Sequence, residues 1–171
     1  MNIKSLKVLR ICALIMGWLL LIGVLTGIWG RYSLYRRTPE NTEGFVTAIA
    51  QFNILSNLSS FFSGFGSVFF AFLVAAVLRM IEKEAPIGKE KAQRLMIVCC
   101  LSYTADAIVR FCSFLPNLSA VVNFFSRSDW MSLLPYAYMG ISPFAPLLYA
   151  ASIYVLFTHF TNMVTFESEV A

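Results

Sequence analysis

Charged residues are scarce in this chain. They make up 13% of its 171 residues, whereas apolar residues make up 58% and the mean hydropathy is +0.73. Soluble domains have about 25% charged and about 45–50% apolar residues. A chain of this composition could not cover its own core with polar surface in water, so we expect lipid to surround most of it. Its length allows a single domain.

Residues that carry catalysis or hold metals are equally scarce. The chain has one histidine, His159, and its four cysteines fall inside apolar runs without a C-x-x-C spacing. Neither a zinc site nor a disulfide framework is expected from that pattern. The sequence also lacks a phosphate-binding loop, paired carboxylates and a nucleophile with a nearby base. We therefore expect no enzyme, metal or cofactor. Haem ligation by His159 is the alternative to an interfacial role.

Basic residues stand at the ends of apolar runs and give a net charge of +4. This placement is typical of membrane orientation and headgroup contact, and it argues against nucleic acid as a partner. The residues are Lys4, Lys7, Arg10, Arg31, Arg36, Arg37, Arg79, Lys83, Lys89, Lys91 and Arg94.

Four apolar segments are long enough to cross a bilayer, which takes about 20 residues in a helix. We therefore predict an all-α polytopic membrane protein whose four transmembrane helices form a single bundle. The helices are expected at about 9–29, 56–81, 95–115 and 133–160, with an inner loop at 82–94. Two shorter apolar segments, Phe45–Phe52 and Leu118–Phe125, are interpreted as helix extensions or interfacial pieces.

The distribution of Lys and Arg predicts the orientation. With the N-terminus inside, eight of these residues lie on the inner side and four on the outer side. Positive charge favours the cytoplasmic side, so both termini are expected in the cytoplasm. A bacterial inner membrane is the expected location.

One segment resembles a known family. The stretch Leu78-Arg79-Met80-Ile81-Glu82-Lys83-Glu84-Ala85-Pro86, followed by Lys89-Glu90-Lys91-Ala92-Gln93-Arg94-Leu95, is similar to the inner loop of a family of small, uncharacterised bacterial membrane proteins with four helices. The similarity covers about a tenth of the chain. It implies a fold and a bacterial membrane, with no activity attached.

The third apolar segment carries two charges one helical turn apart, Asp106 and Arg110. Together with Cys99, Tyr103 and Ser113 they form a polar stripe on one helix face. Charge at bilayer depth is costly and often functional. One interpretation is a self-neutralised pair that fixes helix packing. The other is a transport, proton-relay or ligand role, in which Asp106 carries a proton and releases it.

Small residues repeat along the second segment and indicate close helix packing, because membrane helices approach one another where side chains are small. They are Ser63, Ser67, Ala71 and Ala75 in one row, and Ser56, Ser60 and Gly64 in another. Gly23 and Gly27 add a lone G-x-x-x-G to the first segment. Packing inside the chain and contact with a partner are both open.

Prolines interrupt the fourth segment. Pro143 and Pro146 each remove a backbone donor and free a carbonyl, so we expect a kink there, with Arg110 packed against it. Antiparallel threading also places Asn57 and Asn53 on the same outer side as Arg110. Two tyrosines, Tyr136 and Tyr138, join that side, although Tyr136 and Trp130 are also typical of an interfacial aromatic belt.

Two function classes follow from these features. The first is a non-catalytic accessory or assembly subunit that binds a membrane protein partner, or a second copy of the chain, through small-residue helix faces. The second is a small transporter or channel subunit in which Asp106 and Arg110 line a polar path, with Tyr103 and Asn57 beside them. The sparse intramembrane charge favours the first class.

Overall fold

The computed structural model describes residues 3–37, 45–83, 88–115 and 140–170, with side chains over 5–30, 54–83, 88–115 and 140–161. Its elements are four helices, α1 (Ile3–Arg37), α2 (Phe45–Lys83), α3 (Lys89–Phe114) and α6 (Phe144–Val170). Each contains a stretch long and apolar enough to cross a membrane. The all-α architecture with four such helices is therefore confirmed.

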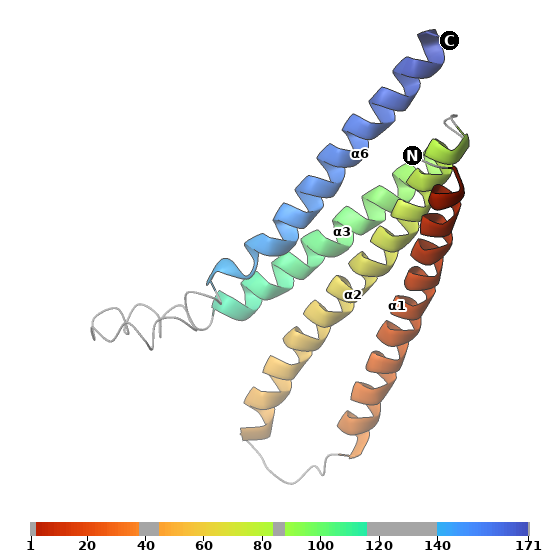
Figure 1. Cartoon of the computed structure of the whole chain (residues 1–171). Helices are drawn as coiled ribbons and strands as arrows, with labels where there is room; N and C mark the ends of the chain where they lie inside the picture. The colour runs from red at the N-terminus through yellow and green to blue at the C-terminus, as the bar shows by residue number, and fades with distance from the viewer. Residues whose placement is uncertain (1–2, 38–44, 84–87, 116–139, 171) are drawn as a thin grey trace, which may run out of the picture.

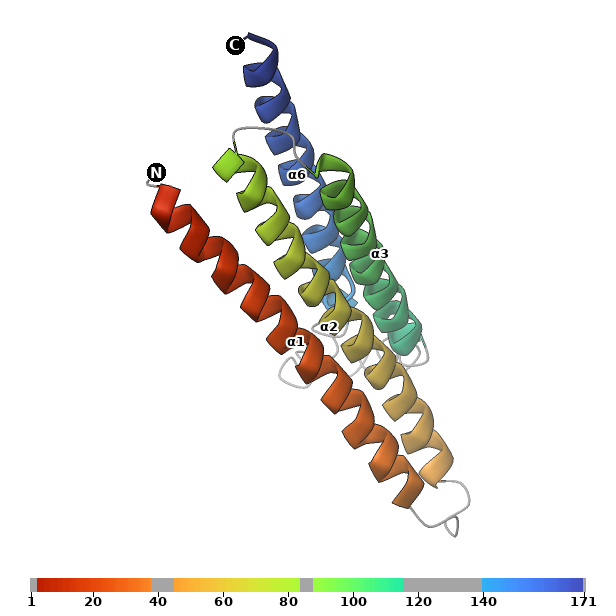
Figure 2. The same cartoon turned by 90° about the vertical axis from the view of Figure 1, so that its right-hand side faces the viewer.

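Consecutive helices run antiparallel and pack side by side. The main helix contacts join α1 to α2, α2 to α3, and α3 to α6. Figure 1 shows α1 and α6 on opposite sides of the molecule, and Figure 2 shows α1 diverging from the other three. The four helices of the predicted bundle therefore pack mainly as a row in the order α1, α2, α3, α6. Both termini and the α2–α3 connection lie at one end (Figure 1).

Several helices are longer than the apolar runs that predicted them. Helix α2 begins at Phe45, so the segment Phe45–Phe52 is an extension of this helix. Helix α3 begins at Lys89, so the loop expected at 82–94 shrinks to the residues between Lys83 and Lys89. The physical reason is that Lys, Glu, Ala, Gln and Arg are strong helix formers although they are polar.

Gly88 is a turn residue directly before α3. Its φ of 85° lies in the left-handed region, which other residues rarely adopt. The backbone amide of Ala92 donates to the Gly88 carbonyl at 3.0 Å, which closes the first turn of α3. Gly88 therefore fixes where the charged start of α3 meets the end of α2.

The fourth predicted helix is interrupted near its prolines. Gly140 and Ile141 are helical, Ser142 and Pro143 form a turn, and α6 starts at Phe144 and continues to Val170. The expected kink at Pro143 and Pro146 is therefore a complete break. Pro146 then falls in the first turn of α6, where a missing N–H costs no hydrogen bond. The residues 133–139 and the segment Leu118–Phe125 lie outside the described residues.

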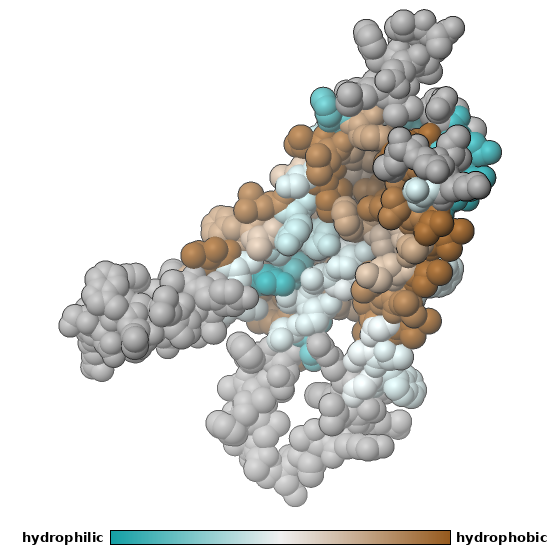
Figure 3. Space-filling model, viewed as in Figure 1, coloured by the Kyte–Doolittle hydropathy of each residue, from teal (hydrophilic) through white to brown (hydrophobic). Residues whose placement is uncertain are grey.

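The packed core lies among α2, α3 and α6. It is a cluster of Leu73, Met80, Ala92, Met96, Cys99, Ile153 and Phe157. Most of the remaining large apolar side chains point outward, and those of α1 are exposed along almost its whole described length. Figure 3 shows this apolar exterior in brown. An exposed apolar surface of this extent is typical of helices that contact lipid or a partner.

Candidate functional site

The polar stripe of α3 faces the interior, as its spacing predicted. Cys99 and Asp106 are buried, and Tyr103, Arg110 and Ser113 are half-buried. The opposite face exposes Val98, Leu101 and Ile108. Side chains three and four residues apart share a helix face, which explains the division.

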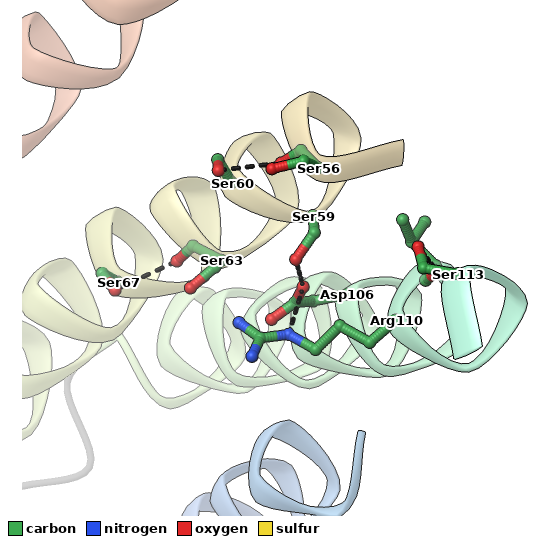
Figure 4. A network of polar contacts seen from close by, with 9 residues as sticks. Ser56, Ser59, Ser60, Ser63, Ser67, Asp106, Arg110 and Ser113 are labelled. Carbon is green, nitrogen blue, oxygen red and sulfur yellow. Dashed lines mark hydrogen bonds and ion pairs between the residues drawn. The ribbon is translucent and has the colours of Figure 1, made fainter. Parts of the chain in front are cut away.

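Asp106 is the most buried charged residue that the structure describes, with a relative exposure of 1%. Its Oδ1 accepts a hydrogen bond from Arg110 Nε at 3.0 Å within α3. The same oxygen accepts a short hydrogen bond from the Ser59 hydroxyl of α2. Figure 4 shows Ser59 reaching across the α2–α3 interface to Asp106. The carboxylate therefore ties two helices together through a single oxygen atom.

The other oxygen of Asp106, Oδ2, differs from Oδ1 in its hydrogen bonding. Oδ2 is fully buried, and no described residue donates a hydrogen bond to it. A buried polar atom without a partner loses its hydration without compensation, at a cost of about 1–3 kcal/mol. The lone pairs of this oxygen are therefore uncommitted within the described residues.

The Arg110 side chain points back along α3, toward the N-terminal end of this helix. Figure 4 shows its side chain running back along α3 toward Asp106, as helical side chains do when they lean toward the N-terminus. The guanidinium thus moves away from the nearby C-terminal end of α3. Its side chain stays 32% exposed. Figure 3 shows a pale, more polar stripe with a teal patch crossing the brown surface near α3.

Tyr103 extends the site toward both neighbouring helices. Its hydroxyl lies 3.4 Å from the Ser67 hydroxyl of α2. Its ring stacks on Tyr149 of α6, with centroids 5.9 Å apart and an interplanar angle of 26°. A Cβ placed on Gly66 would lie 3.0 Å from the Tyr103 ring. Tyr103 therefore holds the α2–α3–α6 layer together beside the Asp106 pair.

The two cysteine thiols deep in α3 also make interhelical contacts. Cys99 donates to the Gly66 carbonyl of α2 at 3.3 Å, and Cys100 donates to the Ala150 carbonyl of α6 at 3.4 Å. Both are free thiols. Among the residues with described side chains no group of three potential metal ligands occurs.

One serine and one asparagine of α2 show where sequence reasoning was incomplete. Asn57 lines a groove between α1 and α2, whereas Ser59, which was not singled out, contacts Asp106. Ser59 precedes Ser63 by four residues, so it continues the row of small residues toward the N-terminal end of α2. That spacing was the available signal. Asn53, Tyr136, Tyr138 and Trp130 lie outside the residues with described side chains.

The small-residue row of α2 packs inside the chain in the C-terminal half of the helix. Ala71 and Ala75 are buried, and the Ser67 hydroxyl donates to the Ser63 carbonyl of its own helix. A Cβ on Gly64 would lie 2.6 Å from a methyl of Val24 in α1. Gly64 therefore sets a close approach of α1 and α2, as small residues do in membrane helices.

The glycine pair of α1 behaves differently. A Cβ placed on Gly23 or Gly27 would meet no atom within 4 Å. Both residues line an apolar groove of about 780 Å³ between α1 and α2, beside Leu20, Ile54 and Phe61. Of the two alternatives that the sequence left open for Gly23 and Gly27, packing inside the chain therefore finds no support among the described residues.

The predicted contact of Arg110 with the break before α6 stays a prediction. The described approach of α3 to that break involves Phe114, whose ring would lie 3.6 Å from a Cβ on Gly140.

Comparisons with known proteins give no relative. The chain matches no family model, no curated protein and no solved structure. The resemblance of residues 78–95 to the inner loop of small four-helix membrane proteins stays a prediction.

Proposed function

We propose that this chain is a non-catalytic accessory or assembly subunit of a complex in a bacterial inner membrane, with both termini in the cytoplasm. Four helices apolar enough to span a membrane support the location. Both termini lie at the end where Lys7, Arg10, Arg79 and Lys83 gather, which supports the orientation because cytoplasmic ends are enriched in positive charge.

One observation carries the accessory role, and it is the unused glycine face of α1. A Cβ on Gly23 or Gly27 would meet no other described element within 4 Å, and both glycines line a groove formed with α2. Small residues are the means by which transmembrane helices associate closely. The groove lining is apolar apart from Asn57 and Ser60 and contains no charged residue. The occupant that fits is a transmembrane helix of a partner protein, with its own small or apolar residues toward Gly23 and Gly27.

Affinity purification in a mild detergent tests this role. The wild-type chain should bring down one partner in a stoichiometric amount. Gly27→Leu should abolish recovery, because Gly27 lines the groove and a Cβ at this position meets no atom within 4 Å, so the added side chain occupies the space of the partner helix. Thr26→Leu is the matched control, since Thr26 is exposed on the same helix outside the groove lining. A homogeneous lone species from wild type, or equal losses in both variants, would contradict the proposal.

A second function, a small transporter or channel subunit, is favoured by the unpartnered Oδ2 of Asp106. In this role the carboxylate exchanges a proton or a cation, and Arg110 and Tyr103 shape the path. Asp106→Asn combined with Arg110→Gln should then lose flux in reconstituted vesicles while expressing normally. Under the accessory role the same double variant should still recover its partner, because neither charge is left unpaired.

A further inference from the structure

Besides the polar stripe and the glycine groove, the described residues form a second cavity at the end that holds both termini. It has a volume of about 740 Å³ and lies where the start of α1, the end of α2 and the start of α3 meet. Its volume falls in the range of about 300–1,000 Å³ that small-molecule sites occupy. Neither of the two functions proposed above uses this cavity.

Positive charge dominates the mouth of this cavity. Five cationic residues line it, Lys7, Arg10, Arg79, Lys83 and Lys91, against one carboxylate, Glu82. The Glu82 side chain is 7% exposed and is already engaged by Arg10, with Lys7 Nζ 3.9 Å from its second oxygen. Within the described residues no carboxylate forms an ion pair with the remaining three cations. Within the part of the chain that the structure describes, the mouth therefore offers positive charge without an ion-pair partner from two helices, α2 and α3.

The start of α3 adds to this charge. Gly88 lines the cavity and precedes the helix without a side-chain hydrogen bond to its first N–H groups. Helix N-termini carry partial positive charge and favour anions. The group that the mouth prefers is therefore an anion, and a phosphate suits a mixture of Arg and Lys donors.

The floor of the cavity is apolar. Leu14 of α1, Phe72 and Ala75 of α2, and Leu95 of α3 line it. Phe72 precedes Lys83 by eleven residues, so the lining runs about 16 Å along the helix from the charged mouth toward the membrane centre. A free inorganic anion would use the mouth alone. An amphiphile with a charged head and a hydrocarbon chain would use both parts.

We propose that this cavity binds an anionic phospholipid of the surrounding bilayer. The phosphate lies among Arg79, Lys83 and Lys91, and an acyl chain follows Leu14 and Phe72 into the apolar part. Basic pockets between transmembrane helices on the cytoplasmic side are suited to such headgroups. The inference depends on the proposed membrane location and orientation, and it is independent of the proposed partner.

The test uses the full chain in a neutral detergent, titrated with phosphatidylglycerol or with phosphatidylcholine of the same acyl chains. Native mass spectrometry counts the retained lipids, and a fluorescent analogue of each lipid gives its dissociation constant. We expect tight retention of about one phosphatidylglycerol and weak retention of phosphatidylcholine. Equal affinity for the two lipids would overturn the proposal. So would displacement of phosphatidylglycerol by inorganic phosphate at equal concentration, since the apolar floor would then contribute nothing.

A matched pair of variants locates the site. Arg79→Gln with Lys91→Gln removes two cations from the cavity, whereas Lys89→Gln with Arg94→Gln removes one Lys and one Arg outside its lining. The first variant should bind phosphatidylglycerol about 30-fold more weakly, the effect expected for two cations at an anionic headgroup. The second should stay within about twofold of wild type. Equal losses in both would show a diffuse charge effect and refute the site.

A measurement on the unmodified chain avoids any dependence on variant folding. A phosphatidylglycerol that carries a photoreactive group near the phosphate should crosslink to the α2–α3 end, around residues 79–91. Crosslinks confined to α6 would refute the site. If the purified chain were monodisperse without any amphiphile, the membrane location itself would fail. If no partner were recovered while the preference for phosphatidylglycerol over phosphatidylcholine remained, the accessory role alone would be contradicted.

Discussion

The ring of Tyr103 in α3 lies directly over Gly66 in α2, so close that a Cβ on Gly66 would sit 3.0 Å from it. The ring is held from the other side by its stack on Tyr149 of α6. A side chain added at Gly66 would therefore have to shift the Tyr103 ring, which also stacks on α6.

Gly66→Ala should destabilise the chain. Overpacking a close contact costs about 1–3 kcal/mol, which exceeds the gain of about 0.5–1 kcal/mol from replacing glycine by alanine inside a helix. Gly27→Ala obtains the same helical gain with no contact to overpack. The thermal unfolding midpoint in detergent should therefore fall for the first variant and stay level or rise for the second. A fall of equal size in both would show that the contact with Tyr103 is unimportant.

Removing one partner of the Asp106–Arg110 pair should cost more than removing both. Arg110→Gln leaves Asp106, which is 1% exposed, with Ser59 as its remaining described donor. Breaking a buried pair in this way costs about 3–5 kcal/mol. Asp106→Asn leaves a cation that is 32% exposed, so its cost should be smaller.

The double variant, Asp106→Asn with Arg110→Gln, should recover most of the stability lost by Arg110→Gln. Denaturant unfolding of the two single variants and the double variant measures the coupling between the two side chains. Additive losses would mean that the two side chains do not stabilise each other.

The spacing of polar residues in α3 was enough to predict which of its faces is buried. Cys99, Tyr103, Asp106 and Arg110 recur at steps of three and four, and a helix has one face for such a set. The four apolar runs likewise predicted four helices, because length and hydropathy are local properties of the chain.

Helix ends and helix neighbours were harder to predict. Lys89 and Lys91 look like loop residues by polarity, but they have good helix propensity, and the turn is set by Gly88. The contact between Gly66 and Tyr103 joins residues 37 positions apart. No local pattern encodes such a pairing, because it depends on how two helices are rotated about their axes.

The cavity lined by Lys7, Arg10, Arg79, Lys83 and Lys91 also depends on contacts between residues far apart in the sequence. Lys7 and Lys91 are separated by most of two helices in sequence, and each alone is an ordinary basic residue at the end of an apolar run. Their approach follows from the antiparallel packing of α1 on α2 and of α2 on α3. The charge was visible in the sequence, whereas the cavity was not.

The proposed orientation predicts which positions a membrane-impermeant thiol reagent reaches. The background for this test replaces the two exposed thiols, Cys12 and Cys112, by serine. Lys83→Cys lies at the end that holds both termini, so it should react only after the membrane is permeabilised. Ser128→Cys, in the segment between α3 and α6, should react in intact cells. The reverse pattern would place the termini outside.

Glu82→Gln should separate the stability of the α1–α2 contact from lipid binding at the cationic cavity. Glu82 accepts from Arg10 and is almost fully buried, so its loss should lower the unfolding midpoint in detergent. The same change removes the single carboxylate of the cavity lining, which raises the positive charge that a phosphate meets. Affinity for phosphatidylglycerol should therefore rise, by about fivefold for one unit of charge.

Gln93→Ala is the control for Glu82→Gln, since Gln93 is exposed, uncharged and outside the cavity lining. It should change neither the unfolding midpoint nor the lipid affinity. Weaker phosphatidylglycerol binding by Glu82→Gln would mean that Glu82 acts mainly by holding Arg10 and Lys7 in place. A purely electrostatic account of the cavity would then be wrong, because removing a repulsive charge can weaken binding only if that charge also orients the donors.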